Sequence, residues 1–331
     1  MDLLPAAGVD LLALLPCPVK VPFEQAFREF IKESQHNLEK FSFRLEGHIN
    51  HHLSFYDLLE KAQAKTDLPN IMITPGVNRF MGHTFQKKFL GQNIFAREQN
   101  YFHRPESLQS NLVDSKGYYF ILAINPLVIV VDHTQIGDVP VPSCWADLLL
   151  PHYKGQIVMR GQKETFCETV LLSFYKEFQL DGIRRLANNV KLGCHPSEMA
   201  KHAGTGKSGW PAISLMPYFF AKTIRNADNV TIIWPEDGVI ASPITMMVQN
   251  TAIPHLRPVI DFLTGPAMGK LWSNAFFFAP FSEIKHNLPC NRQLKWLGWD
   301  FIYSVDAYQL FAQLNSVFRE ARQNKPKEGA L

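Results

Sequence analysis

Arg160 and Lys163 lie in a short basic segment, Arg160-Gly-Gln-Lys-Glu-Thr165, between an expected strand and an expected helix. The first N–H groups of a helix have no partner within the helix, so they attract anions together with nearby cations. This segment therefore predicts a cradle for a carboxylate or phosphate group. A solvated basic turn is the alternative interpretation, and the residues alone leave it open.

Three histidines, His48, His51 and His52, follow an expected strand in the pattern H-x-x-H-H. Two imidazoles three or four residues apart can share a metal ion. No cysteine or carboxylate lies beside them at a suitable spacing, which favours solvated or helix-capping histidines. We therefore expect no metal site, with these three histidines as the alternative.

The segment Gly204-Thr-Gly-Lys-Ser208 resembles the end of a phosphate-binding P-loop. That motif needs a glycine five residues before Gly206, where this chain has Lys201, and it needs a preceding strand and a following helix. Here an expected helix precedes the segment and Pro211 follows it, which indicates a flexible loop. Because no nucleophile–base pair is evident from spacing and no G-x-S-x-G occurs, we expect a protein that is not an enzyme and has no cofactor.

Strand-like and helix-like segments alternate along the chain, which predicts mostly parallel sheets flanked by helices. Apolar or alternating runs predict strands at 11–15, 41–45, 68–74, 118–131, 156–159, 211–215 and 229–234. Helical spacing and capping residues predict helices at 23–31, 54–64, 165–177, 182–188, 197–202, 254–263, 267–274 and 305–323.

The 331 residues are enough for about two domains. Lys and Arg total 33 against 30 Asp and Glu, and the resulting net charge of +3 is too small to indicate a nucleic-acid binder. No window of about 18 apolar residues predicts a membrane-spanning helix.

The apolar stretch from Met1 to Cys17 resembles a lipoprotein signal but has Asp2 and Asp10 in place of a basic start, so it is interpreted as the lead into a buried strand. The cysteines are odd in number and contain no C-x-x-C pair, which favours free thiols. They are Cys17, Cys144, Cys167, Cys194 and Cys290.

Four segments carry a resemblance to a known family. The most specific is P-S-C-W-A-D-L-L-L-P-H-Y-K-G-Q-I-V from Pro142 to Val158. The others are Trp234 to Gly238, Ile260 to Pro266 with Gly269 and Leu271, and Asn274 to Pro280. In this order and spacing they resemble the type-2 periplasmic solute-binding proteins of ATP-binding-cassette (ABC) importers, especially the ferric, thiamine, polyamine and phosphonate branch.

The resemblance implies a two-lobed α/β fold of the periplasmic-binding-protein type 2 class, each lobe a mostly parallel sheet flanked by helices. Lobe one would hold residues 1–125 and 240–331, and lobe two residues 126–239. Hinge crossovers are expected near 123–126 and 235–241, where a few residues can absorb the rotation of hinge closure.

The implied function is binding of a small polar or anionic solute in the cleft between the lobes. The implied partners are that solute and the membrane permease of an ABC importer, with no nucleic acid, and we expect a monomer. A periplasmic or extracytoplasmic location is implied, while the absence of a visible signal peptide leaves a cytoplasmic one open. A cytosolic ligand sensor on the same fold is the alternative function, followed by an enzyme.

Tyr218 resembles the first residue of the tyrosine pair that holds iron in ferric-binding relatives, but Phe219 stands at the second position. The family's histidine and carboxylate are also missing from the turns at residues 16–18 and 74–76. One phenolate cannot hold Fe(III) without further hard ligands. The sequence therefore predicts no ferric site of the paired-tyrosine kind.

The expected ligand site combines two strand-end turns, the basic segment, the family's binding segment and a residue beside the return crossover. Its members are Cys17, Thr74, Pro75, Gly76, Arg160, Lys163, Thr165, Tyr218 and Ser242. The basic residues favour a solute that bears a carboxylate or a phosphate.

Overall fold

The computed structural model of the chain describes residues 9–34, 41–47, 62–100, 102, 110–162, 164–280 and 293–323. No helix within these ranges has the length and apolar character needed to cross a lipid bilayer. The chain divides into two units. The first comprises Met1–Ile124, Pro243–Leu288 and Gly298–Asp306, and the second comprises Asn125–Ser242, Pro289–Leu297 and Ala307–Leu331.

The sheet of the first unit has the order β2-β1-β3-β10. Strand β1 (Leu11–Leu15) pairs in parallel with β2 (Phe43–Gly47) and with β3 (Ile71–Pro75), and β10 (Val239–Val248) runs antiparallel to β3. All five side chains of β1 are buried, because the strand is apolar on both of its faces. The carboxyl ends of β1, β2 and β3 therefore meet at one edge of this sheet.

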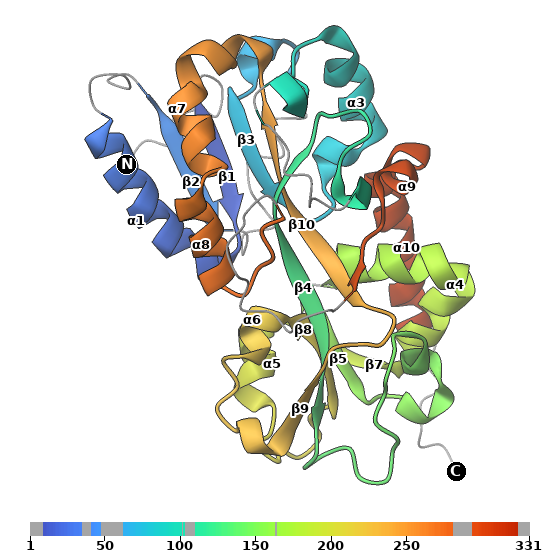
Figure 1. Ribbon diagram of the computed structural model, residues 1–331. Helices are drawn as coiled ribbons and strands as arrows, with labels where there is room; N and C mark the ends of the chain where they lie inside the picture. The colour runs from blue at the N-terminus through green and yellow to red at the C-terminus, as the bar shows by residue number, and fades with distance from the viewer. Residues whose placement is uncertain are drawn as a thin grey trace. The chain divides into compact units, whose positions relative to one another are not determined.

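The described residues of the first unit include five α-helices. They are α1 (Cys17–Glu33), α3 (His83–Phe89), α7 (Ile253–Leu263), α8 (Pro266–Asn274) and α9 (Trp299–Ser304). Phe30 of α1 stacks on Phe262 of α7 at 4.3 Å between ring centroids, and Phe23 of α1 contacts Trp272 of α8 at 6.5 Å. Figure 1 shows α1, α7 and α8 gathered beside β1 and β2. Helix α1 begins before the expected start at residue 23, because Pro18 suits the first turn of a helix.

The second unit contains a set of parallel strands with antiparallel neighbours. Strand β5 (Ile157–Gln162) pairs in parallel with β7 (Val190–Cys194) and β8 (Ile213–Pro217). Strand β4 (Phe120–Asp132) runs antiparallel to β8 and to β9 (Val230–Ile233). The carboxyl ends of β5, β7 and β8 lie at one edge, and the remaining short strands are β6 (Thr165–Phe166) and β11 (Leu294–Lys295).

Helices α4 (Glu168–Asn189) and α10 (Ala307–Gln323) pack against each other in the second unit (Figure 1), which also holds α5 (Pro196–His202) and α6 (Tyr218–Ala221). Gln179 interrupts α4 with a φ of 54°. The two expected helices at 165–177 and 182–188 correspond to the two halves of α4. The expected start at Thr165 is wrong, because Thr165 lies in β6, paired with Gln162 of β5.

Trp145, the centre of the most specific family segment, is fully buried in the second unit. Its indole Nε1 donates to the carbonyl of Gly238 at 2.7 Å, and its ring meets Phe174 of α4 edge-on. The Tyr153 hydroxyl of the same segment donates to the Pro140 carbonyl at 2.7 Å. These residues pack the unit.

The expected strands fall where the structure has strands β1 to β5, β8 and β9, with ends shifted by at most three residues. The expected helix at 54–64 lies outside the described residues. The division between units differs from the expected lobes in its later part, because α10 joins the second unit. The buried side chains of Leu314 and Phe318 explain this, since Phe318 packs on Phe166 of β6 at 4.6 Å.

Candidate functional site

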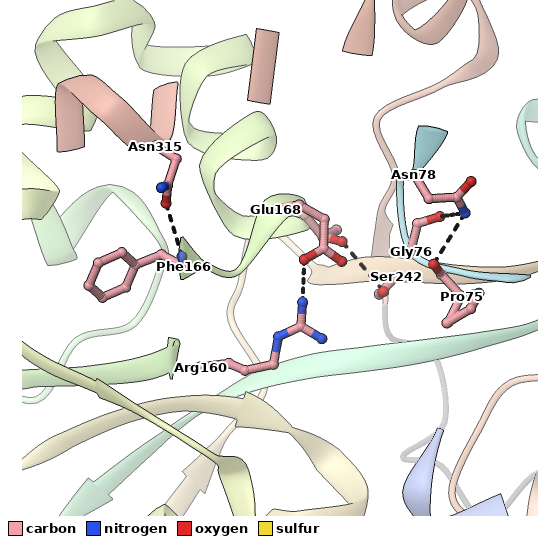
Figure 2. Close-up of polar contacts among 9 residues, drawn as sticks. Pro75, Gly76, Asn78, Arg160, Phe166, Glu168, Ser242 and Asn315 are labelled. Atoms are coloured by element: carbon pink, nitrogen blue, oxygen red, sulfur yellow. Dashed lines mark hydrogen bonds and ion pairs between the residues drawn. The ribbon is translucent and has the colours of Figure 1, made fainter. Parts of the chain in front are cut away.

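Arg160 lies in β5 and forms an ion pair with Glu168, the first residue of α4 (Figure 2). Both side chains are mostly buried, with 22% of Arg160 and 13% of Glu168 exposed. Burial lowers the pKa of Arg160, but Cys167 and Glu168 outweigh this effect and raise it above the ordinary value. The guanidinium thus keeps its charge at every physiological pH, while Glu168 balances that charge.

The start of α4 also reaches β10. Thr169, which is fully buried, donates its hydroxyl hydrogen to the Ser242 hydroxyl at 3.4 Å. Ser242 is partly exposed and lies in the second unit beside the start of α4. Arg160, Glu168 and Ser242 are therefore gathered around a single helix N-terminus.

The β5–β6 hairpin that carries Arg160 is tied to α10. The backbone N–H of Phe166 donates to Asn315 Oδ1 at 2.9 Å (Figure 2). Asn315 Nδ2 donates to the carbonyl of Glu164 at 3.1 Å. Glu164 has a φ of 64°, a conformation that turns the chain back from β5 into β6. Thr165 is exposed on this hairpin.

The carboxyl edge of β5, β7 and β8 brings titratable groups together. Arg160 pairs in register with Cys194 at the end of β7, and His195 follows directly. Burial, with Arg160 as the next cause, lowers the pKa of His195, so its imidazole is neutral at neutral pH. His195 meets Phe220 of α6 edge-on at 5.7 Å. This contact links the Arg160 region to α6.

Tyr218 is the first residue of α6 and directly follows β8. Burial raises the pKa of Tyr218, so the side chain is a neutral phenol that can donate or accept a hydrogen bond. Its ring meets Trp234 edge-on at 5.3 Å. Phe219, the next residue, offers no oxygen. Among the described residues no group of three or more His, Cys, Asp or Glu could hold a metal, and the absence of a paired-tyrosine ferric site stays a prediction.

In the first unit, the turn after β3 uses its polar groups internally. Asn78 Nδ2 donates to the carbonyls of Pro75 and Gly76 at 3.3 Å (Figure 2). It also donates to Thr74 Oγ1 at 3.1 Å. The N–H of Gly76 donates to the Pro243 carbonyl at 2.7 Å. Thr74, Pro75 and Gly76 are all buried. The polar groups of this turn are therefore used within the unit, so the turn can contribute a surface of fixed shape but few hydrogen-bonding groups to a ligand.

Cys17 begins α1 directly after β1 and is partly exposed. Cys144, Cys167 and Cys194 are free thiols, and Cys290 lies outside the described residues. Burial raises the pKa of Cys194 to about 12 and also raises that of Cys167. These two thiols stay protonated, which makes them poor nucleophiles.

Several residues of the expected sites fall outside the part of the chain that the structure describes. Lys163, His48, His51 and His52 lie outside the described residues. The glycine-rich segment from Gly204 to Ser208 follows α5 rather than a strand, as the sequence predicts for a loop.

Three polar residues of these sites were not identified from sequence: Glu168, His195 and Asn78. A signal existed for His195, since Pro196 behind it suits the first position of a helix and marks His195 as the residue that caps α5. Asn78 likewise accepts from the Phe80 N–H at 3.0 Å, as a capping residue does. No sequence pattern indicated that Glu168 is the first residue of a helix, because the expected helix began three residues earlier.

Comparisons with known proteins give a family and a fold. A sequence model of the family described as bacterial extracellular solute-binding protein matches residues 66–305. No curated protein matches the chain.

Solved structures of low sequence identity share the fold. Apo ferric ion-binding protein A of Pasteurella haemolytica is 13% identical with a TM-score of 0.65, over 97% of this chain and 99% of that chain. A Trichodesmium protein in complex with iron and citrate is 14% identical with a TM-score of 0.64, over 95% and 99%. The periplasmic binding protein AfuA of Actinobacillus pleuropneumoniae, with fructose-6-phosphate bound, is 13% identical with a TM-score of 0.63, over 95% and 98%. The fold is therefore that of periplasmic binding proteins.

Proposed function

Because the chain belongs to the family of bacterial extracellular solute-binding proteins, we propose that it captures a small anionic solute and delivers it to the permease of an ABC importer. The family name supports a location outside the cytoplasm, in the periplasm where the cell has one. On this proposal the protein binds its solute without converting it.

The observation that carries the proposal is the carboxyl edge of β5, β7 and β8. In open α/β sheets, ligands bind beyond the carboxyl ends of the strands. Here that edge bears Arg160, His195 and Tyr218, which are respectively a permanent cation, a neutral imidazole and a neutral phenol. These groups suit an anion that also carries hydrogen-bonding atoms.

In the second unit, the solute contacts that we propose come from five residues. Arg160 and Lys163 bind the anionic group, while Tyr218, Ser242 and Thr165 supply hydroxyl groups. In the first unit, Cys17 at the N-terminal end of α1 and the turn formed by Thr74, Pro75 and Gly76 stay predictions for solute contacts. The Arg160–Glu168 pair supports a role in binding, because a ligand carboxylate or phosphate can share the guanidinium N–H groups.

The ligands of two structural relatives are examples of small anionic solutes. The relatives above bind iron with citrate in one case and fructose-6-phosphate in another. Citrate carries carboxylates and fructose-6-phosphate carries a phosphate, so both fit the anion that we propose for this chain. The proposal includes no iron site for this chain, because Phe219 stands where ferric-binding relatives have the second tyrosine.

Native mass spectrometry of the purified protein tests the proposal by identifying a retained small molecule. Calorimetry with that molecule should then show affinity about tenfold to a hundredfold weaker for Arg160→Ala, since a hydrogen bond to a charged group contributes about 1.5–3 kcal/mol. Arg185→Ala, which removes an exposed arginine of α4, is the matched control. Unchanged affinity in both Arg160→Ala and Tyr218→Phe would place the site elsewhere.

A further inference from the structure

Trp234 is a buried tryptophan whose indole Nε1 has no hydrogen-bond partner among the described residues. Only 8% of its surface is exposed. A buried donor without an acceptor is costly, and such a group in a native protein calls for an explanation. A bound ligand that supplies an acceptor oxygen is one such explanation.

The position of Trp234 distinguishes it from other tryptophans with the same property. Trp272 lies in the core of the first unit against Phe23 and Phe277, and Trp210 lies against His202. Trp234 instead contacts Tyr218, the tyrosine at the carboxyl end of β8. Among these three orphan donors, Trp234 is therefore the one that adjoins the proposed site.

The two rings form an aromatic corner, with centroids 5.3 Å apart and planes at 78°. Such a corner presents apolar ring surface together with two hydrogen-bonding groups, the Tyr218 hydroxyl and the Trp234 N–H. Carbon atoms that carry oxygen substituents match this combination. A bare oxyanion has no carbon skeleton to pack against the rings.

The Arg160–Glu168 ion pair also favours an organic anion that carries hydroxyl groups. Glu168 neutralises the charge of Arg160, and its carboxylate would repel a second negative charge placed beside it. A carboxylate oxygen accepts hydrogen bonds from hydroxyl groups. The pair therefore suits a ligand that brings one anionic group and neighbouring hydroxyls.

We infer that Trp234 is a ligand-binding residue, and that the solute is a hydroxylated organic anion with an acceptor oxygen bound by the Trp234 N–H. This inference rests on the proposed function and specifies its solute class. The anionic group binds at Arg160, a hydroxyl group binds Glu168, and the carbon skeleton packs on Tyr218 and Trp234.

Calorimetry with fructose-6-phosphate, citrate and inorganic phosphate tests the inference. The wild-type protein should bind at least one of the two organic anions about tenfold or more tightly than inorganic phosphate, because only they can use the aromatic corner. Trp234→Phe removes the N–H and keeps most of the ring. It should weaken binding of that organic anion about threefold to tenfold, the effect of one neutral hydrogen bond.

Trp210→Phe is the matched control, because Trp210 belongs to the same unit, is also 8% exposed and also has an unpartnered Nε1. Its affinity for the organic anion should equal that of wild type. Should Trp234→Phe fail to fold, ¹H–¹⁵N spectra of the wild-type protein replace it. The Trp234 indole N–H resonance should shift when the organic anion binds, while that of Trp210 should not.

Three outcomes would overturn the inference. Inorganic phosphate bound as tightly as both organic anions, or no binding of either organic anion at millimolar concentration, would reject the solute class. Trp234→Phe with wild-type affinity would reject the role of the indole. If Arg160→Ala still lost affinity for the retained molecule in that case, the proposed function would stand while this inference failed.

Discussion

The two units end their parallel strands with different chemistry. In the second unit, the strand ends carry Arg160, His195 and Tyr218, so charge and titratable groups are concentrated there. In the first unit, the turn after β3 is buried and its carbonyl groups accept hydrogen bonds from Asn78. The described strand ends of the second unit carry ionisable side chains, whereas the turn after β3 in the first unit forms a closed hydrogen-bond network.

This difference indicates a division of roles. Polar residues that satisfy one another inside a unit maintain its shape, whereas polar residues with ionisable groups and partial exposure can exchange partners with a ligand. Substitutions in the first unit's turn should therefore lower stability more than affinity. Substitutions at the strand ends of the second unit should do the reverse.

The largest effect is expected for Asn78→Ala. The change leaves the buried Thr74 hydroxyl, two carbonyls and the Phe80 N–H with one partner fewer, which should lower the free energy of unfolding by about 2–4 kcal/mol. Urea unfolding measures it, with the exposed Asn188→Ala of α4 as control. An Asn78→Ala protein as stable as the control would remove the contrast between the units.

Glu168→Gln tests whether the ion pair with Arg160 limits anion binding in the second unit. Without the carboxylate, Arg160 presents an uncompensated cation, so inorganic phosphate should bind about threefold to tenfold more tightly. Calorimetry at constant ionic strength measures this gain. Asp181→Asn removes an exposed charge from the same helix and serves as control. Equal phosphate affinity in Glu168→Gln and wild type would show that the pair does not limit anion binding.

Asn315→Ala should loosen the β5–β6 hairpin without touching a ligand. Two hydrogen bonds join Asn315 to this hairpin, and their loss should lower affinity for the retained solute about threefold because Arg160 is held less firmly. Hydrogen exchange at Phe166 should accelerate in parallel. Gln313→Ala, on an exposed face of α10, is the control. A loss of affinity with unchanged exchange would contradict the positioning role.

The smallest effect concerns pH. The pKa of His195 is lower in the folded protein than its usual 6.5, mainly because of burial and then because of Arg160. The unfolded chain therefore binds this proton more readily, so His195 should reduce stability as the pH falls through about 6.5. His195→Gln should flatten the pH dependence of the urea midpoint below neutrality, and an unchanged dependence would contradict this expectation.

The sequence predicted the positions of helices and strands better than it predicted which side chains contact one another. Runs such as Leu11 to Leu15 identify buried strands because a fully covered strand must be apolar on both faces. Arg160 was identified from its place after a strand, but its partner Glu168 was not. That pairing depends on the turn at Glu164, whose left-handed backbone no local pattern predicts for a glutamate.

Long-range packing was equally hidden from the sequence. The apolar stripe of α10 predicts a buried face, yet it does not say which unit covers that face. Similarly, the contact between Tyr218 and Trp234 arises because β8 and β9 flank β4 on its two sides. Strand order of this kind is a property of the whole fold.

The packing of α10 on α4 has a consequence for synthesis. A ribosome produces α4 first and α10 only after residues 190–306 have been added. Domains tend to fold as units while the chain emerges. The second unit therefore stays incomplete, with the α10-binding face of α4 uncovered, until translation has passed through residues 243–288 and 298–306 of the first unit. A chaperone that recognises apolar helices would find α4 accessible throughout that interval.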